Sequence, residues 1–189
     1  MKIILGSSSQ WRKQILLELG YEFDVISPGI DEKGIRHDNP EQLTLAIAEA
    51  KNEAVRARVN EPAIIITSDT VVVCNGEVRE KPANTEEAYE FLKSYSTYPA
   101  ETCTAVVVSN TESGLMIKEV DIAKIYFRPI PDEVILKLIN QGNIFHSSGG
   151  FITEDPLLNP FIDRIDGTID SIMGMPKNMT RKMIEGARG

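Results

Sequence analysis

The chain has 189 residues, of which 42% are hydrophobic, and this suits one domain over residues 1–189, or two small lobes that share a core. Its formal net charge of −8 at pH 7 excludes a binder of duplex nucleic acid, which needs a basic face, while a few local cations could still form a phosphate pocket. No apolar run approaches membrane-spanning length and the two cysteines lack metal or redox spacing, so we expect a cytoplasmic protein that enters no membrane.

Strand and helix patterns alternate at the start of the chain. The elements expected there are a strand over 2–5, a helix over 10–19, a strand over 22–27 and a helix over 41–59. Gly20 ends the first helix as its C′ residue, and Pro40 opens the second. Trp11 recurs with Ile15 and Leu19 at helical spacing, so its side chain can equally belong to the core.

The β-branched run from Ile64 to Val73 predicts a strand buried on both faces. Asp69 lies in the middle of this run, where an ionised carboxylate is costly unless a metal, a lysine cluster or a hydrogen-bonded water pairs with it. The alternative is that Asp69 marks a turn between two strands, held by Thr67 or Thr70. The run therefore predicts either a functional carboxylate or a turn at this position.

The second half of the chain continues the mixed pattern. The dipeptide Asn75-Gly76 predicts a tight hairpin, which Lys81-Pro82 closes, and Thr85 is expected to cap the following helix. Further on we expect strands over 104–109 and 115–128, a helix over 131–140, and a tail in which loops at 147–150 and 174–176 alternate with short helices. Strands and helices in this order predict an α/β domain.

The stretch Gly6–Ser9 places small residues between a strand and a helix N-terminus, where free backbone N–H groups can bind an anion. Arg12, one turn into the helix, can add a bidentate contact to a phosphate. The stretch is neither a Walker loop nor a dinucleotide-binding fingerprint, because the required lysine and glycines are missing. The alternative is an ordinary serine N-cap at the start of the helix.

A set of acidic residues and lysines suits a divalent cation that bridges phosphate oxygens. Its members are Asp31, Glu32, Asp69, Lys51 and Lys81. Magnesium takes few protein carboxylates and completes its octahedron with phosphate and water. The lysines would neutralise charge while a phosphoryl group is transferred. In the alternative interpretation Asp31-Glu32 is a solvated loop, and Lys51 extends along the edge of an apolar helix face.

Six short blocks, spread over nearly the whole chain, carry the strongest functional signal. They are Leu5–Lys13 with Ile15-Leu16, Asp31-Glu32, Ala50-Lys51, Ser68–Thr70, Lys81-Pro82 and Gly174–Pro176. In their order and separations these blocks resemble the motifs of the Maf family of nucleoside triphosphate pyrophosphatases. No single block is specific, but six in register are.

The resemblance implies an α/β fold of the Maf/ITPase-like kind, with two lobes, a mixed sheet, flanking helices and a central nucleotide-binding cleft. Members of the family are often homodimers. The resemblance also implies that a nucleoside triphosphate is hydrolysed between its α- and β-phosphates to a monophosphate and pyrophosphate. A divalent cation, Mg²⁺ or Mn²⁺, is expected as the cofactor.

The resemblance further assigns roles to residues of this sequence. Asp69 matches the proton-accepting aspartate of the family and Glu32 a carboxylate on the metal side, so both are expected to bind the metal. Glu32, Lys51 and Lys81 are expected to take part in catalysis together with Asp69. The residues that match phosphate-binding positions are Ser7, Arg12, Lys51 and Lys81, and we expect Ser9 to bind substrate beside them.

Three positions bear on the base of the nucleotide, and their signals conflict. Trp11 stands where many members carry a basic residue and Glu154 near a usual glutamine, and both resemble the branch of the family that acts on 7-methylguanosine triphosphate. Thr70 instead resembles the branch that acts on dTTP and UTP. All three residues are expected to contact the substrate.

The expected function is therefore pyrophosphate-releasing hydrolysis of a nucleoside triphosphate, either 7-methyl-GTP or another modified nucleotide. One alternative is a dTTP/UTP pyrophosphatase of the same family. The others are a nucleotide-binding regulatory protein without turnover, and a nucleotidyltransferase, which also needs acidic residues and magnesium but transfers its product to an acceptor.

Overall fold

The computed structural model describes all 189 residues, which divide into two compact units. The first unit comprises Met1–Thr70, Thr104–Asp121 and Met173–Gly189, and the second comprises Val71–Cys103 and Ile122–Ile172. Each unit has a hydrophobic core of its own. No helix combines the length and apolar character that crossing a membrane requires.

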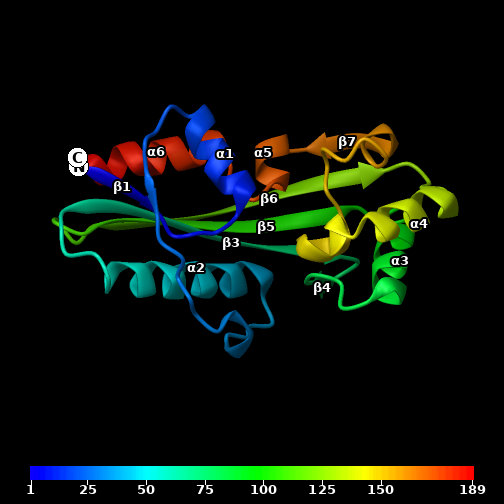
Figure 1. The fold of residues 1–189 in the computed structure, drawn as a ribbon, viewed down its shortest axis with the longest axis horizontal. Helices are drawn as coiled ribbons and strands as arrows, with labels where there is room; N and C mark the ends of the chain where they lie inside the picture. Colours follow the sequence, from blue (N-terminus) through cyan, green and yellow to red (C-terminus); the bar gives the residue numbers. More distant parts are fainter. The chain divides into compact units, whose positions relative to one another are not determined.

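Seven strands form one mixed sheet in the order β2-β1-β3-β5-β6-β7, and β4 pairs with β3 outside this path (Figure 1). The strands are β1 (Lys2–Leu5), β2 (Asp24–Val25), β3 (Ala63–Cys74), β4 (Glu77–Arg79), β5 (Ala100–Asn110), β6 (Met116–Phe127) and β7 (Ile162–Asp166). β1 runs parallel to β2 and β3. β4 is antiparallel to β3, and β7 is antiparallel to β6.

Helices flank the strands in both units. The α-helices are α1 (Gln10–Glu18), α2 (Pro40–Arg56), α3 (Thr85–Ser94), α4 (Asp132–Gln141), α5 (Ile169–Ile172) and α6 (Lys177–Arg188). Short 3₁₀ turns are η1 (Glu32–Gly34), η2 (Asn143–His146), η3 (Ser148–Gly150) and η4 (Asn159–Phe161). The predicted α/β class, with a mixed sheet and flanking helices, is confirmed.

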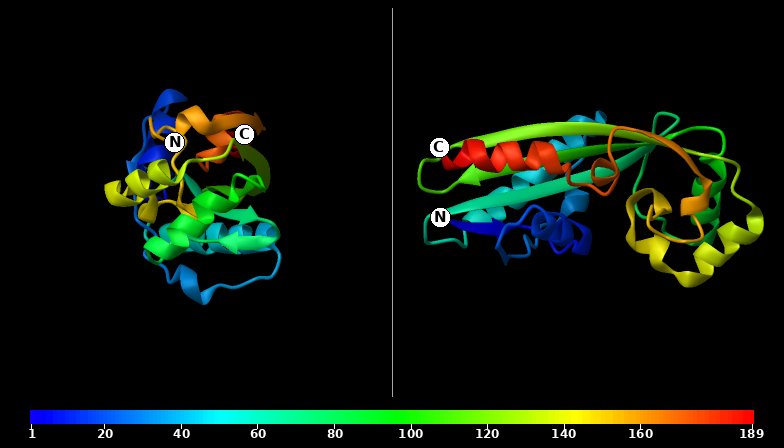
Figure 2. Two further views of the ribbon diagram at one scale, coloured as in Figure 1. Left: turned by 90° about the vertical axis from the view of Figure 1, so that its right-hand side faces the viewer. Right: turned by 90° about the horizontal axis from the view of Figure 1, so that it is seen from above.

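In the first unit, β3 buries both of its faces. Ile64 and Ile66 pack in one cluster with residues of α1 and α6, whereas Ile65 packs in another with Val55 of α2. Successive side chains of a strand point to opposite faces, so α1 and α6 cover one face of these strands and α2 the other (Figure 1). Both chain termini lie at one end of this unit (Figure 2).

The second unit packs α3 and α4 with its strand residues around an aromatic centre. Tyr95 stacks near Phe127 and Phe151, with ring centroids 5.8 and 5.5 Å away, and the two phenylalanine rings are 5.7 Å apart. Edge-to-face and tilted ring pairs of this kind add to the stabilisation that burial gives. The centre therefore holds α3 against the loop that carries Phe151.

The strongest local signals of the sequence are confirmed. β3 is one continuous strand with Asp69 inside it, so the alternative of a turn at this position is wrong. The hairpin forms at Asn75-Gly76, where φ is 51° and 82°, as a tight turn between antiparallel strands requires. Gly20 also has the positive φ, 81°, of a residue that ends a helix.

Other local predictions are wrong in detail. Asn84, and not Thr85, caps α3, because its Oδ1 accepts a hydrogen bond from the Glu87 N–H at 2.9 Å. The strand predicted over 22–27 is reduced to β2, and β7 was not expected at all. The tail also ends in a helix of 12 residues, α6, which is not short.

A first prediction concerns Gly6, which follows β1. A Cβ atom there would lie 2.5 Å from Thr67 Cγ2 and 3.0 Å from Val55 Cγ2, and both neighbours are buried. We expect Gly6→Ala to lower the free energy of unfolding by about 1–3 kcal/mol, measured by urea denaturation.

The control is Gly186→Ala within α6, where the new Cβ would meet only the end of the Ile117 side chain, at 3.2 Å. This change should raise the free energy of unfolding by about 0.5–1 kcal/mol, because alanine favours the helix. A Gly6→Ala protein as stable as the parent would contradict the close approach.

Candidate active site

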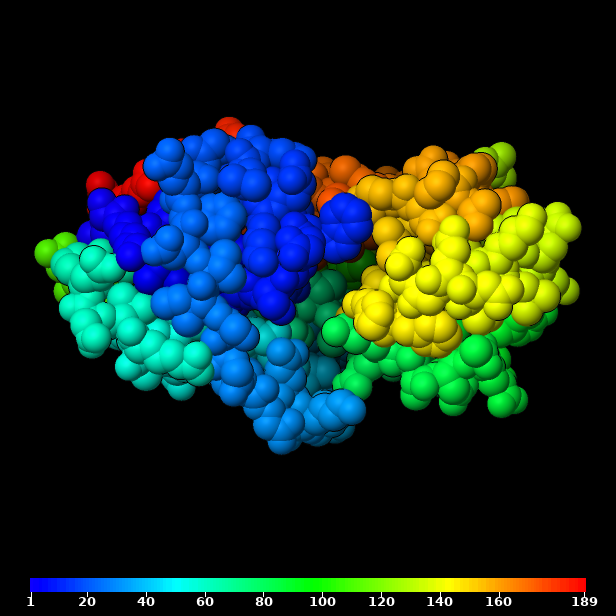
Figure 3. All heavy atoms as spheres, viewed as in Figure 1, coloured from blue at the N-terminus to red at the C-terminus, as the bar shows by residue number.

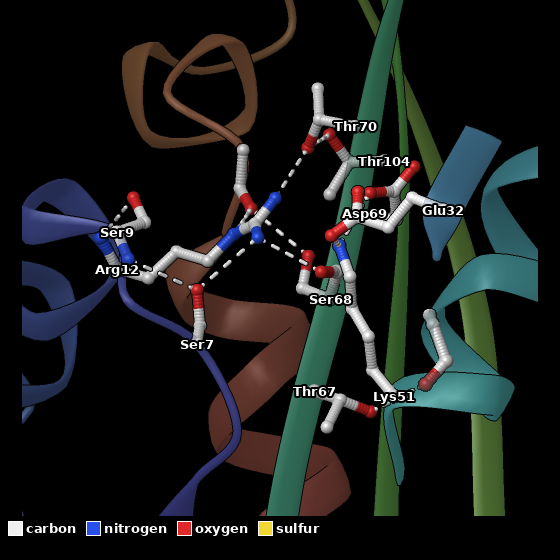
Figure 4. Close-up of polar contacts among 12 residues, drawn as sticks. Ser7, Ser9, Arg12, Glu32, Lys51, Thr67, Ser68, Asp69, Thr70 and Thr104 are labelled. Atoms are coloured by element: carbon white, nitrogen blue, oxygen red, sulfur yellow. Dashed lines mark hydrogen bonds and ion pairs between the residues drawn. The ribbon is translucent and has the colours of Figure 1, made fainter. Parts of the chain in front are cut away.

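A buried ion pair joins β3 to α2. Lys51 Nζ lies 2.8 Å from Asp69 Oδ1 and 3.1 Å from Glu32 Oε1 (Figure 4). Asp69 is only 7% exposed and Lys51 is also buried, so the two charges compensate each other away from water. The alternative interpretation, in which Lys51 extends along the edge of the apolar helix face to place its ammonium in water, is therefore wrong.

Glu32 reaches Lys51 from η1, in the connection between β2 and α2. This connection is exposed on the surface of the first unit, where Figure 3 shows it in lighter blue. The Glu32 side chain is 51% exposed, whereas its neighbour Asp31 turns back to accept a hydrogen bond from the Lys33 N–H at 3.2 Å. Of the predicted acidic pair, only Glu32 joins the ion cluster.

The alternation of β3 distributes the polar residues between its two faces. Thr67 donates to the Ala48 carbonyl of α2 at 2.8 Å, and Asp69 points to the same side. Ser68 and Thr70 point to the other side, where Ser68 donates to the Gly174 carbonyl at 3.2 Å. Figure 4 shows the two groups, with Lys51 on one side of β3 and Arg12 on the other.

Arg12 fills the space beyond the end of β1. β1 ends at Leu5, opposite Ile66 of β3, so the next carbonyls of β3 have no partner in β1. Arg12 Nη1 donates to the Ser68 carbonyl at 2.8 Å, Nε to the Gly174 carbonyl at 3.1 Å, and Nη2 to Thr70 Oγ1 at 3.1 Å. One guanidinium thus connects α1, β3 and the loop before α6.

The hydrogen bonds of Arg12 bear on its predicted phosphate contact. With a longer bond from Nη1 to Ser7 Oγ at 3.5 Å, four of the five guanidinium N–H groups point at protein atoms. Burial lowers the pKa of the Arg12 guanidinium, and the carboxylates of Asp69 and Glu32 oppose that shift. A bidentate phosphate contact would require some of these bonds to be exchanged.

Ser7 and Ser9 organise the start of α1. Ser9 Oγ accepts a hydrogen bond from the Arg12 N–H at 3.4 Å, which makes Ser9 the N-cap, and Ser7 Oγ accepts from the Ser9 N–H at 3.2 Å. The N-cap interpretation is therefore confirmed for Ser9. Substrate binding by these two serines stays a prediction.

Asp69 and Glu32 are the residues of this site whose chemistry fits a hard cation. Each gives one carboxylate oxygen to Lys51, which leaves its second oxygen without a protein donor. No cluster of three or more histidine, cysteine, aspartate or glutamate side chains suits a metal ion. A pair of carboxylates is nevertheless adequate for magnesium, which draws its other ligands from phosphate and water.

The remaining predicted residues divide between the units. Trp11 in the first unit is 41% exposed, so the interpretation of it as a core residue is wrong. Lys81 and Glu154 belong to the second unit, where both side chains are exposed. Lys81 has no carboxylate partner, which leaves its charge available to an anion. Their predicted contacts with the substrate stay predictions.

The sequence did not predict the place of Thr104 in the site, or the contact that Gly174 makes there. Thr104 Oγ1 lies 3.0 Å from Thr70 Oγ1, although nothing in the sequence links these positions. Gly174 has a φ of 88°, and a Cβ there would lie 2.7 Å from Thr70 Oγ1. The block Gly174–Pro176 marked this loop, but not its carbonyl as the acceptor for Arg12.

Comparisons with known proteins agree along the whole chain. The pattern of the family described as Maf-like protein matches residues 2–187. A 7-methyl-GTP pyrophosphatase of Dictyostelium discoideum is 43% identical, over 96% of this chain and 95% of its own length. A 7-methyl-GTP pyrophosphatase of Idiomarina loihiensis is 34% identical, over 93% of this chain and 89% of its own. A dTTP/UTP pyrophosphatase of Vibrio vulnificus is 32% identical, over 97% of both chains.

A second prediction tests the structural role of Arg12. In Arg12→Lys, a single ammonium on a flexible stem cannot serve acceptors that the guanidinium reaches from three different nitrogen atoms. We expect a loss of about 2–4 kcal/mol in the free energy of unfolding, measured by urea denaturation.

The matched control is Lys13→Gln, because Lys13 is the next residue of α1 and forms no ion pair. It should stay within about 0.5 kcal/mol of the parent. Equal denaturation midpoints for Arg12→Lys and the parent would show that the four bonds do not stabilise the fold.

Proposed function

Because the chain belongs to the Maf-like protein family, we propose that it is a nucleoside triphosphate pyrophosphatase, which releases a nucleoside monophosphate and pyrophosphate. The observation that carries the proposal is the buried ion pair of Asp69 and Lys51, which the exposed carboxylate of Glu32 joins. A carboxylate is costly to bury, and here it is kept in a strand with one oxygen unused. Such an arrangement suits a proton acceptor better than a structural ion pair.

Asp69 is the proposed general base. Its free oxygen accepts a proton from a water molecule, and the oxygen of that water forms a bond to the α-phosphorus. The bond between the α-phosphorus and the oxygen bridging to the β-phosphate then breaks, and pyrophosphate leaves with that oxygen. Lys51 holds the other oxygen of Asp69 at 2.8 Å and so fixes the direction in which the carboxylate points.

Glu32 and Asp69 are the residues that would hold Mg²⁺ or Mn²⁺. When bound, such a cation neutralises the phosphate charge and polarises the phosphoryl oxygens. Lys51 adds positive charge at the same place, because its ammonium already contacts both carboxylates. Lys81, together with Ser7, Ser9 and the backbone N–H groups at the start of α1, would bind the phosphates.

We favour 7-methyl-GTP as the substrate. The 7-methylguanine ring carries a positive charge, which the exposed face of Trp11 can attract. The carboxylate of Glu154 can accept hydrogen bonds from the N1–H and the exocyclic amine of guanine. The relative that shares 43% of its residues with this chain bears the name 7-methyl-GTP pyrophosphatase, against 32% for a dTTP/UTP pyrophosphatase.

Thr70 is the residue that resembles the branch of the family acting on dTTP and UTP, and its hydroxyl forms hydrogen bonds within the protein. Its hydroxyl accepts a hydrogen bond from Arg12 and shares another with Thr104. This leaves it poorly placed to identify a base and weakens the alternative of a dTTP/UTP pyrophosphatase. Release of pyrophosphate without an acceptor also separates the proposal from a nucleotidyltransferase and from a regulatory protein that does not turn nucleotide over.

The proposal includes a cytoplasmic location and a homodimer, as the family resemblance implies. Both cysteines are free thiols, as expected in a reducing compartment. Light scattering coupled to size-exclusion chromatography tests the dimer. A monomer at micromolar concentration would remove this part of the proposal and leave the reaction unaffected.

A third prediction concerns the base. Asp69→Asn keeps the size of the side chain and an oxygen for Lys51, but it removes the proton acceptor. We expect turnover in a pyrophosphate-release assay to fall by about 10²–10⁴-fold, with nucleotide binding retained in calorimetry. Asp31→Asn is the control, because Asp31 only caps η1 and does not join the ion cluster. Turnover of Asp69→Asn within a few-fold of the parent would remove Asp69 from the mechanism.

A fourth prediction concerns specificity. The parent should show a higher kcat/KM for 7-methyl-GTP than for GTP, dTTP or UTP. Trp11→Ala should reduce kcat/KM for 7-methyl-GTP by about 2- to 30-fold, which corresponds to a cation–π interaction, and should leave GTP hydrolysis unchanged. Trp11→Phe retains an aromatic face and should lose less. Faster hydrolysis of dTTP or UTP by the parent would reject 7-methyl-GTP and leave the pyrophosphatase proposal standing.

A further inference from the structure

β4 ends at Arg79, two residues before Lys81, and the Arg79 side chain is buried in the second unit. The Arg79 guanidinium lies over the rings of Phe91 and Tyr95, 4.7 and 5.1 Å from their centroids. It donates to the Phe91 carbonyl at 3.2 Å and to Ser94 Oγ at 2.6 Å, in the last turn of α3. The carbonyl end of a helix attracts a cation, so Arg79 fastens the end of β4 to α3.

The next residue, Glu80, is held through its backbone. Its carbonyl accepts a hydrogen bond from the Gly149 N–H at 3.0 Å, and the Gly149 carbonyl accepts one from the Tyr95 hydroxyl at 2.7 Å. Pro82 is buried against Gly150, where a Cβ would lie 3.1 Å from Pro82 Cγ. The residues on both sides of Lys81 are therefore anchored, whereas the Lys81 side chain is exposed.

Gly149 has the conformation that this connection needs. Its φ is 72°, and a Cβ there would lie 2.8 Å from Val72 Cγ2 and 2.9 Å from the Tyr95 hydroxyl oxygen. No other residue fits both the backbone and the space, so the N–H and the carbonyl of Gly149 face their two partners at close range. The loop around Gly149 is thereby tied to the segment that carries Lys81.

Tyr95 is well suited to hold Gly149. It is 1% exposed, and its ring is fixed between Phe127 and Phe151. Burial raises the pKa of the Tyr95 hydroxyl, so the group keeps the proton that it donates. None of the functional blocks in the sequence includes this residue, and the proposed chemistry does not use it.

We propose that Tyr95 is a positioning residue for Lys81. Through Gly149 it fixes the backbone of Glu80, and so it sets where the Lys81 ammonium meets the polyphosphate of the nucleotide. The inference rests on the proposed function, because Lys81 needs a phosphate to bind. A purely structural hydroxyl would stabilise the unit in the same way whether or not Lys81 is present, and this difference can be measured.

The test is a double-mutant cycle with Tyr95→Phe and Lys81→Ala. Tyr95→Phe keeps the packed ring and removes only the hydroxyl. We expect it to lower kcat/KM for the triphosphate, and the affinity for inorganic pyrophosphate in calorimetry, by about three- to tenfold. In the Lys81→Ala background the same change should have no further effect, since the residue that Tyr95 positions is absent.

Tyr89→Phe is the matched control. Tyr89 lies on α3, of which Tyr95 is the C-cap residue, and its hydroxyl bonds to Asp132 and not to the Gly149 loop. Its loss should leave both quantities within a factor of two of the parent, by the usual independence of sites without shared partners. Comparing the two variants separates the loss of a tyrosine hydroxyl in general from the loss of this one.

Several results would overturn the inference. These are an unchanged Tyr95→Phe protein, equal losses with and without Lys81, an equal loss in Tyr89→Phe, or a parent that binds no pyrophosphate. A parent that binds pyrophosphate but cleaves no nucleotide would instead reject the proposed function. In that case the binding measurements alone still decide whether Tyr95 acts through Lys81.

Discussion

Burying the carboxylate of Asp69 inside β3 is the constraint on which the first unit depends. An isolated charge in that position would cost several kcal/mol, so a cation has to arrive from another element. α2 supplies it, and therefore α2 has to pack on the correct face of β3 in a register that brings Lys51 opposite Asp69. The bond from Thr67 to the Ala48 carbonyl holds that register one turn away.

The same strand organises a second polar group because of its alternation. The Ser68 and Thr70 side chains point away from α2, where the Ser68 hydroxyl donates to the Gly174 carbonyl. Beyond the end of β1, Arg12 donates to the Thr70 hydroxyl and to the backbone carbonyls of Ser68 and Gly174. A parallel partner as short as β1 leaves carbonyls of its neighbour unpaired, and a guanidinium can satisfy several acceptors at once. Arg12 thus supplies the hydrogen-bond donors that β3 lacks because β1 is short.

Local chemistry explains which features could be predicted from the sequence. The β-branched run of β3 and the Asn75-Gly76 turn each depend on residues close together in the chain, and both are confirmed. β7 was missed because three of its five residues are both charged and exposed, a weak pattern for a strand. The cap of α3 was misplaced by one residue because Asn84 and Thr85 are both good capping residues. Arg12 and the Gly174 carbonyl are 162 residues apart, so no local pattern could show that they meet.

The division of the chain into units has a consequence for its synthesis on the ribosome. When the ribosome has added Ile172, every residue of the second unit has been synthesised, whereas the first unit still lacks Met173–Gly189. Until α6 emerges, the apolar residues of β1 and β3 that pack against it stay uncovered, and Arg12 has no Gly174 carbonyl to bind. The first unit, although its synthesis begins earlier, is therefore completed after the second, and its apolar surface favours aggregation until α6 has left the exit tunnel.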